Sequence, residues 1–319
     1  MSSLPFEFLD RLKLILPPEV CLDVLRTFSR ANPTTVRINT LKISREEILS
    51  QLKDRGIAFR TVGWSPEALV LEGITQKDLG ETEWAKQGLL YSQNLSSMLP
   101  VLALAPKPGE NVLDMCAAPG SKTTQIAACL KNSGRLVAVE AVRDRFYRLK
   151  AVCEYLGAGN VEFKLMDARG FRFTGEYFDR ILVDASCSSE GRFRTSEPKS
   201  FAYWSPRKIR EMVQKQRGIL MTASHLLRPA SPEGGPGGVL VYSTCTFAPE
   251  ENEGVVDWLL RKSKVPLRLE PVEFDGVARY PALRQWGQKD FSPQVDQCFR
   301  VLPNDLMEGF FIAKFVRAA

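Results

Sequence analysis

The sequence contains a single histidine, His225, in 319 residues. A zinc site built from imidazoles needs more than one histidine, so this class of site is excluded and we expect no metal. A histidine general base would have to be His225 itself. The residue lies in the apolar stretch 219–227, which we interpret as a packed helix. We therefore predict a core or boundary position for His225 and no part in catalysis.

Long apolar runs and leader features are also missing. No run approaches the length needed to span a membrane, and the first residues, MSSLPFEFLD, have no signal-peptide pattern. We therefore expect a cytoplasmic protein without membrane contact. Seven cysteines, an odd number without paired spacing, argue against a disulfide framework. The 43 basic and 37 acidic residues leave a net charge of +6, which is compatible with a polyanionic partner.

Neither common phosphate-binding motif is present in the stretch that most resembles a nucleotide site. This stretch, DMCAAPGSKTTQ at residues 114–125, has the order strand, turn and helix, with Asp114 at the strand end. It lacks the glycines of G-x-x-x-x-G-K-[ST] and of G-x-G-x-x-G. A small-residue loop before a helix N-terminus suits a nucleoside without a pyrophosphate, such as S-adenosylmethionine. The alternative is an ordinary glycine-containing turn.

From residue 111 onward, apolar runs alternate with amphipathic ones. We predict strands at 111–114, 135–140, 160–166, 179–184 and 238–243, with helices between them, a last helix at 250–264 and a terminal strand pair at 266–272 and 309–316. This alternation predicts an α/β fold with a doubly wound, Rossmann-like sheet in residues 101–319. Glu140 closes the second strand, where a carboxylate suits the ribose of a bound nucleoside.

Residues 1–100 form a separate compositional unit, for which we predict a small N-terminal α+β module. The predicted elements are helices at 4–16 and 20–28, a strand at 34–40, a helix at 44–54, strands at 58–62 and 68–72, and a helix at 95–104. Ser44 and Glu47 have the spacing of a capping box at the start of the third helix.

Two cysteines follow predicted strands: Cys187, three residues after Asp184, and Cys245. A buried structural cysteine is the usual alternative, but two at equivalent places favour chemistry. The chemistry we expect is methyl transfer to a carbon such as cytosine C5. A thiolate that adds to C6 makes C5 nucleophilic, a carboxyl group such as Asp184 beside N3 would stabilise the product, and the thiolate can later leave.

The chain resembles the NOL1/NOP2/Sun family of RNA cytosine-5 methyltransferases. The matching segments are NPTTVRINTLK (32–42), YSQNLSSMLP (91–100), DMCAAPGSKTTQ (114–125), DASCSSEG (184–191), YSTCTFAPEENE (242–253) and EGFFIAKF (308–315). The resemblance implies a class I methyltransferase domain in which Cys245 is the nucleophile and Cys187 assists breakdown of the covalent adduct. The chain departs from the family pattern at Ser186, where the family usually has proline, and at Asn304, where histidine is common.

The resemblance also implies which residues bind S-adenosyl-L-methionine. They are Cys116, Ala117, Ala118, Pro119, Gly120, Ser121, Lys122, Glu140, Asp167 and Asp184. Arg145 is a further candidate, for which a solvated helix arginine is the alternative.

A basic stretch with interleaved aromatic residues is the candidate RNA face. It comprises Arg192, Arg194, Lys199, Arg207, Lys208, Arg210, Lys215 and Arg217 with Phe193, Phe201, Tyr203 and Trp204. Aromatic rings there could stack on unpaired bases. The alternative is a solvated helix with buried aromatics.

We therefore expect a monomeric, S-adenosylmethionine-dependent RNA cytosine-C5 methyltransferase whose residues 1–100 help to bind RNA. FRTSEPKSFAYWSPRKI (193–209) resembles bacterial ribosomal enzymes, which favours ribosomal RNA over transfer RNA. A methyltransferase of protein or DNA would need the same cofactor site without paired cysteines. A non-catalytic RNA-binding protein would need neither Cys245 nor Asp184.

Overall fold

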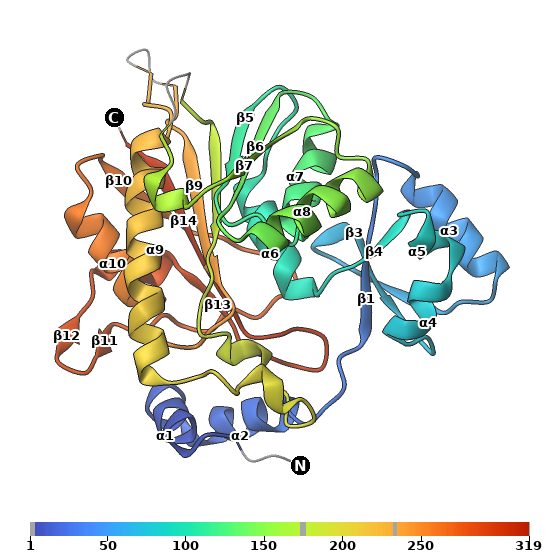
Figure 1. The fold of residues 1–319 in the computed structure, drawn as a ribbon. Helices are drawn as coiled ribbons and strands as arrows, with labels where there is room; N and C mark the ends of the chain where they lie inside the picture. The colour runs from blue at the N-terminus through green and yellow to red at the C-terminus, as the bar shows by residue number, and fades with distance from the viewer. Residues whose placement is uncertain (1–3, 173–176, 232–234, 319) are drawn as a thin grey trace.

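Two separate sheets organise the chain in the computed structural model, which describes residues 4–172, 177–231 and 235–318 (Figure 1). The larger sheet has the strand order β10-β14-β9-β8-β5-β6-β7, with β13 also paired to β14. Its parallel strands are β5 (Asn111–Asp114), β6 (Arg135–Glu140), β7 (Val161–Leu165), β8 (Arg180–Asp184) and β9 (Val239–Thr244). Strand β14 (Phe310–Arg317) runs antiparallel to β9, to β10 (Leu267–Glu270) and to β13 (Phe299–Val301).

This topology confirms the predicted Rossmann-like sheet, including its terminal strand pair. The strand order reverses at β5, which lies between β6 and β8. Ligands of open α/β sheets bind beyond the carboxyl ends of the strands at such a reversal. The fold therefore directs attention to the loops that follow β5, β6, β8 and β9.

Helices cover both faces of the larger sheet (Figure 1). One face carries α6 (Leu95–Leu104), α7 (Ser121–Leu130) and α8 (Arg143–Leu156), and the other carries α9 (Pro206–Leu226) and α10 (Glu253–Lys262). Successive residues of a strand point to opposite faces of the sheet. In β5, Val112 is buried in the hydrophobic cluster on one face and Leu113 in the cluster on the other. Burial on both faces explains why these strands are continuous apolar runs in the sequence.

The smaller sheet is antiparallel, in the order β2-β3-β1-β4. Its strands are β1 (Thr34–Ile38), β2 (Phe59–Val62), β3 (Ser65–Leu71) and β4 (Leu90–Ser92), and it is accompanied by α3 (Arg45–Asp54), α4 (Gln76–Glu81) and α5 (Glu83–Lys86). Ser44 caps α3 by accepting the Glu47 N–H at 3.2 Å. The reciprocal pair of bonds that defines a full capping box is seen at α4, between Thr75 and Asp78.

The first two helices, α1 (Phe6–Ile15) and α2 (Pro18–Thr27), pack against the larger domain. Phe8 and Phe28 are buried together with Phe193 and Phe247, which follow β8 and β9. The Phe8 and Phe193 rings lie 4.9 Å apart. The N-terminal helices therefore support the loops at the carboxyl edge of the main sheet.

The remaining elements are short. They are the 3₁₀ turns η1 (Ala168–Gly170), η2 (Glu190–Arg192), η3 (Pro198–Ser200) and η4 (Pro293–Gln297), and the hairpin strands β11 (Gln285–Trp286) and β12 (Lys289–Asp290). Within the described ranges, no helix is both long and apolar enough to cross a membrane.

Candidate active site

The loop after β5 brings its backbone close to α8. Gly120 has φ of +113°, and a Cβ there would lie 3.1 Å from Val152 Cγ1, so this position requires glycine. Helix α7 begins at the next residue, Ser121. Asp114, at the end of β5, is buried and accepts the Thr123 hydroxyl at 2.8 Å. Burial raises the pKa of Asp114 to about 7, and its role here is to brace the start of α7.

Glu140 ends β6 in a buried position. One oxygen accepts the Val142 N–H at 2.8 Å, and the other lies 3.7 Å from Arg145 Nη1. Arg145 also donates to the Ala118 carbonyl at 2.7 Å. Arg145 is thus bound to the small-residue loop and to Glu140, rather than being a fully solvated helix arginine.

Asp167 lies just beyond β7 and is half exposed. Its carboxylate accepts Arg169 N at 2.9 Å and binds the Arg169 guanidinium at 2.6 Å. These bonds with Arg169 hold the pKa of Asp167 below its usual value.

Asp184 ends β8 and forms an ion pair with Lys122, the second residue of α7, at 2.7 Å. Its other oxygen accepts the Ser243 hydroxyl at 2.6 Å. Lys122 also donates to Ser97 Oγ at 2.7 Å and lies 5.5 Å from the centre of the Phe310 ring. Asp184 therefore has a fixed orientation at the carboxyl end of its strand.

The sulfur atoms of Cys187 and Cys245 lie 3.3 Å apart. The contact with Cys187 and the charge of the Arg192 guanidinium hold the pKa of Cys245 below its ordinary value, although burial opposes them. The contact with Cys245 and burial raise the pKa of Cys187. The arrangement therefore favours a thiolate at Cys245 beside a protonated Cys187.

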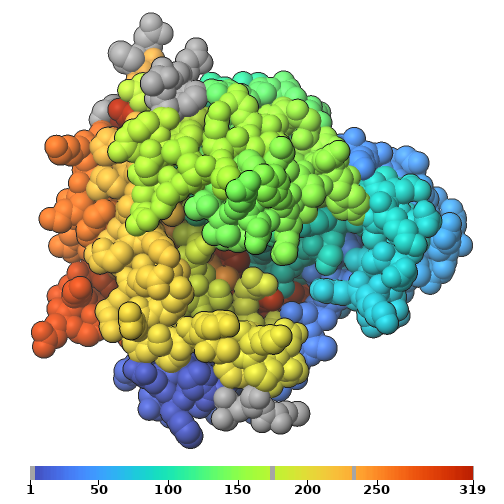
Figure 2. Space-filling model, in the orientation of Figure 1, coloured from blue at the N-terminus to red at the C-terminus, as the bar shows by residue number. Residues whose placement is uncertain are grey.

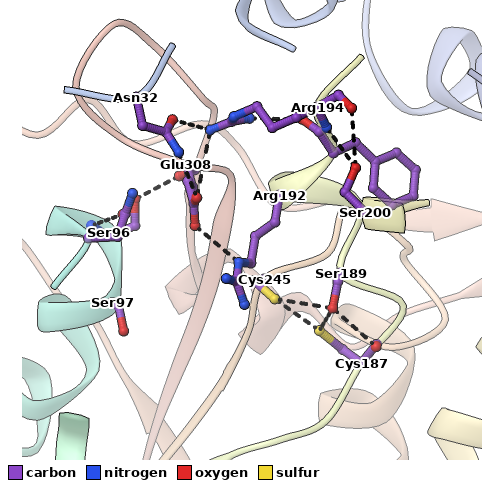
Figure 3. A network of polar contacts seen from close by, with 12 residues as sticks. Asn32, Ser96, Ser97, Cys187, Ser189, Arg192, Arg194, Ser200, Cys245 and Glu308 are labelled. Atoms are coloured by element: carbon purple, nitrogen blue, oxygen red, sulfur yellow. Dashed lines mark hydrogen bonds and ion pairs between the residues drawn. The ribbon is translucent and has the colours of Figure 1, made fainter. Parts of the chain in front are cut away.

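Arg192 reaches the sulfur pair from the segment after Cys187 (Figure 3). Glu308 holds it through a contact of 3.4 Å between Arg192 Nε and Glu308 Oε2. The other Glu308 oxygen faces Arg194 at 3.6 Å and Asn32 at 3.4 Å. The sequence indicated Arg192 only as one cation of a basic stretch, because its proximity to Cys245 depends on β14 bringing Glu308 alongside.

Two buried carboxyl groups connect the cysteine loops reciprocally. Glu190, after Cys187, accepts the Thr246 hydroxyl at 2.9 Å and the Phe247 N–H at 3.1 Å. Glu251, after Cys245, accepts the Ser188 N–H at 3.1 Å. Burial raises the pKa of Glu190 and raises that of Glu251 to about 8. Sequence analysis missed this pair, although both residues lie within motifs that it quoted.

Cys187, Cys245, Asp184 and Arg192 line a cavity of about 700 Å³. Figure 2 shows a hollow on this face, bordered by green, yellow and blue-green parts of the chain. The candidate residues that line the cavity are Cys116, Ala117, Ala118, Pro119, Ser121, Lys122, Arg145, Asp184, Cys187 and Cys245. Of the candidates, all of which lie in the described part of the chain, Gly120, Glu140 and Asp167 are not in its wall.

The basic stretch is only partly an exposed face. Phe193 and Phe201 are buried, and the Trp204 indole donates to Glu190 at 2.8 Å. Phe193, Phe201 and Trp204 pack in the core beneath α1, which favours the alternative of buried aromatics for these three rings. Tyr203 is exposed, at 87%. Arg217 lies over the Trp258 ring at 5.2 Å.

The two residues that depart from the family pattern, Ser186 and Asn304, both take part in hydrogen bonds with nearby residues. The Ser186 carbonyl accepts Gln216 Nε2 of α9 at 3.0 Å, a backbone bond that does not depend on the serine side chain. Asn304 Oδ1 accepts the N–H groups of Leu306 and Met307 at 2.9 and 3.0 Å. His225 is exposed at the end of α9, so the expectation of a core or boundary position was wrong.

No cluster of three or more His, Cys, Asp or Glu side chains suited to a metal ion occurs among the described residues.

Comparison with known proteins matches two family models. Residues 101–316 match the family described as 16S rRNA methyltransferase RsmB/F. Residues 5–76 match a ferredoxin-like domain described as Methyltr_RsmF/B-like. The first match covers the larger sheet and the cysteine loops, and the second covers α1 to β3.

Two curated relatives illustrate the range of the similarity. A ribosomal RNA small subunit methyltransferase F of Pectobacterium carotovorum is 36% identical over 326 residues, covering 100% of this chain and 63% of that protein. A 28S rRNA (cytosine-C(5))-methyltransferase of Mus musculus is 35% identical over 311 residues, covering 96% of this chain and 38% of that protein. The chain thus spans less than two thirds of the length of these relatives.

Two solved structures share the fold over nearly the whole chain. A methyltransferase homolog protein from Pyrococcus horikoshii has a TM-score of 0.83 and 31% identity, covering 98% of this chain and 95% of the other. NSun6 from Pyrococcus horikoshii with SFG has a TM-score of 0.81 and 25% identity, covering 99% of this chain and 98% of the other.

Proposed function

The chain belongs to the 16S rRNA methyltransferase RsmB/F family, and from that premise we propose that it methylates cytosine C5 of ribosomal RNA with S-adenosylmethionine. The observation that carries the proposal is the pair of sulfur atoms, 3.3 Å apart, in the cavity that also contains Asp184. Two similar proteins named for ribosomal RNA favour that substrate over transfer RNA.

The loop at residues 116–122 is suited to hold the cofactor. All of its residues except Gly120 line the cavity at the N-terminal end of α7, where backbone N–H groups are available to a ligand. We propose that this loop and Arg145 contact the cofactor, with Glu140 on its ribose and Asp167 near its adenine. When bound, S-adenosylmethionine supplies an electrophilic methyl group.

Cys245 is the proposed nucleophile. The Arg192 charge and the Cys187 thiol favour its thiolate, and thiolates are strong nucleophiles toward an electron-poor carbon. Bonding of Cys245 Sγ to cytosine C6 makes C5 electron-rich, and C5 is the atom to be methylated. Asp184, fixed by Lys122, is the group we place at the N3 edge of the pyrimidine.

Cys187 is proposed to act after the methyl group has been transferred. Its thiol pKa is raised first of all by Cys245. Once Cys245 is bonded to C6, its sulfur no longer carries a negative charge, so the Cys187 thiolate becomes easier to form. Cys187 can then accept the C5 proton, and the C6–sulfur bond breaks to release Cys245.

We also propose that residues 1–100 contribute to RNA binding and that the protein acts as a cytoplasmic monomer. A non-catalytic RNA-binding protein is less favoured, because such a protein would not need Cys245 close to Cys187.

Bisulfite sequencing of RNA from a strain that lacks this gene tests the substrate. We expect one or more ribosomal cytosines to lose methylation, and to regain it with the wild-type gene but not with Cys245→Ala. Loss confined to transfer RNA would exclude the ribosomal substrate, and unchanged methylation in both RNA classes would reject the function.

A further inference from the structure

The loops that carry Cys187 and Cys245 are bonded to each other on both sides of the sulfur atoms. The hydroxyls of Ser188 and Thr246, each next to a cysteine, are hydrogen-bonded at 2.7 Å. Gly191 N donates to the Cys245 carbonyl at 2.9 Å. With the bonds of Glu190 and Glu251, these contacts within the protein hold the two loops, and with them the sulfur atoms, close together.

The sulfur separation is close to the range of a covalent link. A disulfide bond is about 2.0 Å long, so roughly 1 Å of approach would be needed, which small side-chain rotations can supply. The sulfur atoms are now 3.3 Å apart, and both cysteines line the open cavity and are partly exposed. Small oxidants can therefore reach them.

The seven cysteines differ in their tendency to ionise. Burial raises the thiol pKa of Cys21, Cys116, Cys129, Cys153 and Cys298, and contact with Cys245 raises that of Cys187. Cys245 is the cysteine whose pKa is lowered. Because peroxides react with thiolates, oxidation should begin at Cys245.

We propose that Cys187 and Cys245 are a site of oxidative modification, at which a hydroperoxide converts the two thiols into a disulfide. The Cys245 thiolate attacks the peroxide oxygen, the O–O bond breaks, and hydroxide or alkoxide leaves with a proton taken from solvent. The Cys187 sulfur then attacks the Cys245 sulfenic acid, and water leaves as the S–S bond forms. Both sulfurs are oxidised and one peroxide is reduced.

The disulfide removes the thiolate that the proposed methyl transfer requires, and its formation needs neither RNA nor cofactor. It also protects Cys245 from irreversible oxidation to sulfinic acid, because Cys187 captures the sulfenic acid first. Reduction by a dithiol restores both thiols.

The test treats the reduced full chain with equimolar hydrogen peroxide, without RNA or cofactor, and follows intact mass and non-reduced peptides. We expect the loss of two hydrogens, a peptide pair joining residues 187 and 245, and reversal by dithiothreitol. Cys187→Ser should instead add oxygen at Cys245. Cys129→Ser, at a half-buried cysteine outside the cavity, should still form the 187–245 disulfide.

Arg192→Met should slow the first step, because the thiolate fraction of Cys245 falls, whereas Arg207→Met removes an exposed charge on α9 and should not. Sulfinic acid at Cys245 in the wild type, or a disulfide to another cysteine, would overturn the proposal. These measurements detect the state of the cysteine thiols and do not depend on RNA methylation. A chain that forms the disulfide but methylates no RNA would therefore refute the proposed function and leave the disulfide proposal standing.

Discussion

The carboxyl edge of the main sheet and the exposed face of α9 hold their charged side chains differently. At the edge, Lys122 and Asp184 are paired at 2.7 Å with side chains 9% and 26% exposed. On α9, Lys208 and Lys215 share Glu211, and all three side chains are between 37% and 48% exposed. Fixed charges suit chemistry at one atom, whereas solvated charges suit a polyanion bound through many weak interactions.

The ion pair that anchors the Cys245 loop is also buried, unlike the ion pairs on α9. The Cys245 loop is anchored by the pair Arg300–Glu253 at 2.6 Å, whose side chains are 3% and 0% exposed. Arg300 also donates to the Phe247 carbonyl at 3.2 Å. Removing one partner of a buried pair leaves the other charge without compensation, while an exposed pair contributes little.

Arg300→Met should therefore have the largest effect on stability. We expect a loss of about 3–5 kcal/mol in the free energy of unfolding, because Glu253 would remain buried without its partner. Urea denaturation measures it. The matched control is Arg261→Met, which removes the exposed partner of Asp257 and should cost at most about 1 kcal/mol. Equal losses in the two variants would remove the contrast between the regions.

Glu140→Ala tests the edge as a ligand site. Loss of a charge-assisted bond to a ribose hydroxyl should weaken S-adenosylmethionine binding by about 1.5–3 kcal/mol. Isothermal calorimetry measures the affinity, with Glu162→Ala, an exposed carboxylate on β7 paired with Arg135, as the control. Unchanged affinity in Glu140→Ala would reject the ribose assignment.

Glu251→Gln should alter the pH dependence of stability. Burial raises the folded pKa of Glu251 from 4.5 to about 8, so the folded state binds this proton more tightly than the unfolded state. The resulting stabilisation is complete below the unfolded pKa and is lost as pH rises toward the folded value. Stability should therefore fall less steeply between these values in Glu251→Gln. Denaturation across a pH series that gives parallel curves for variant and wild type would contradict the raised pKa.

Substitutions on the exposed face of α9 should have the smallest effect, and they should change only RNA binding. Neutralising Arg207 and Arg210 with glutamine should flatten the dependence of log affinity on log salt by about 0.7 for each RNA phosphate that the variant no longer neutralises. Filter binding measures the slope. Neutralising Lys262 and Lys264, exposed near the end of α10, should leave it unchanged. If both variants behave alike, α9 is an ordinary solvated helix.

The local sequence pattern predicted strands whose carboxyl ends lie at the candidate active site. The bounds 111–114 and 135–140 agree with β5 and β6, because a continuous apolar run followed by small residues has few alternative structures. The short strands β4 and β13 were missed, since their pairing depends on other segments of the chain, β1 and β14, rather than on their own sequence.

Contacts between distant segments were beyond sequence reasoning. Motifs indicated both cysteines, but the 3.3 Å contact depends on the register between β8 and β9. Likewise, composition could not distinguish the buried Phe193 from the exposed Tyr203, because the distinction depends on where α1 packs.

The roles of the two cysteines are tested most directly by trapping RNA. Methyl transfer is allowed to proceed with Cys187→Ala, Cys245→Ala and the double variant, followed by denaturing electrophoresis. Cys187→Ala should form the bond to C6 and then stall, giving a protein–RNA band that survives denaturation and is absent from the other two. A stable band with Cys245→Ala and none with Cys187→Ala would reverse the assignments. If no variant traps RNA although all fold and bind it, the covalent mechanism is contradicted.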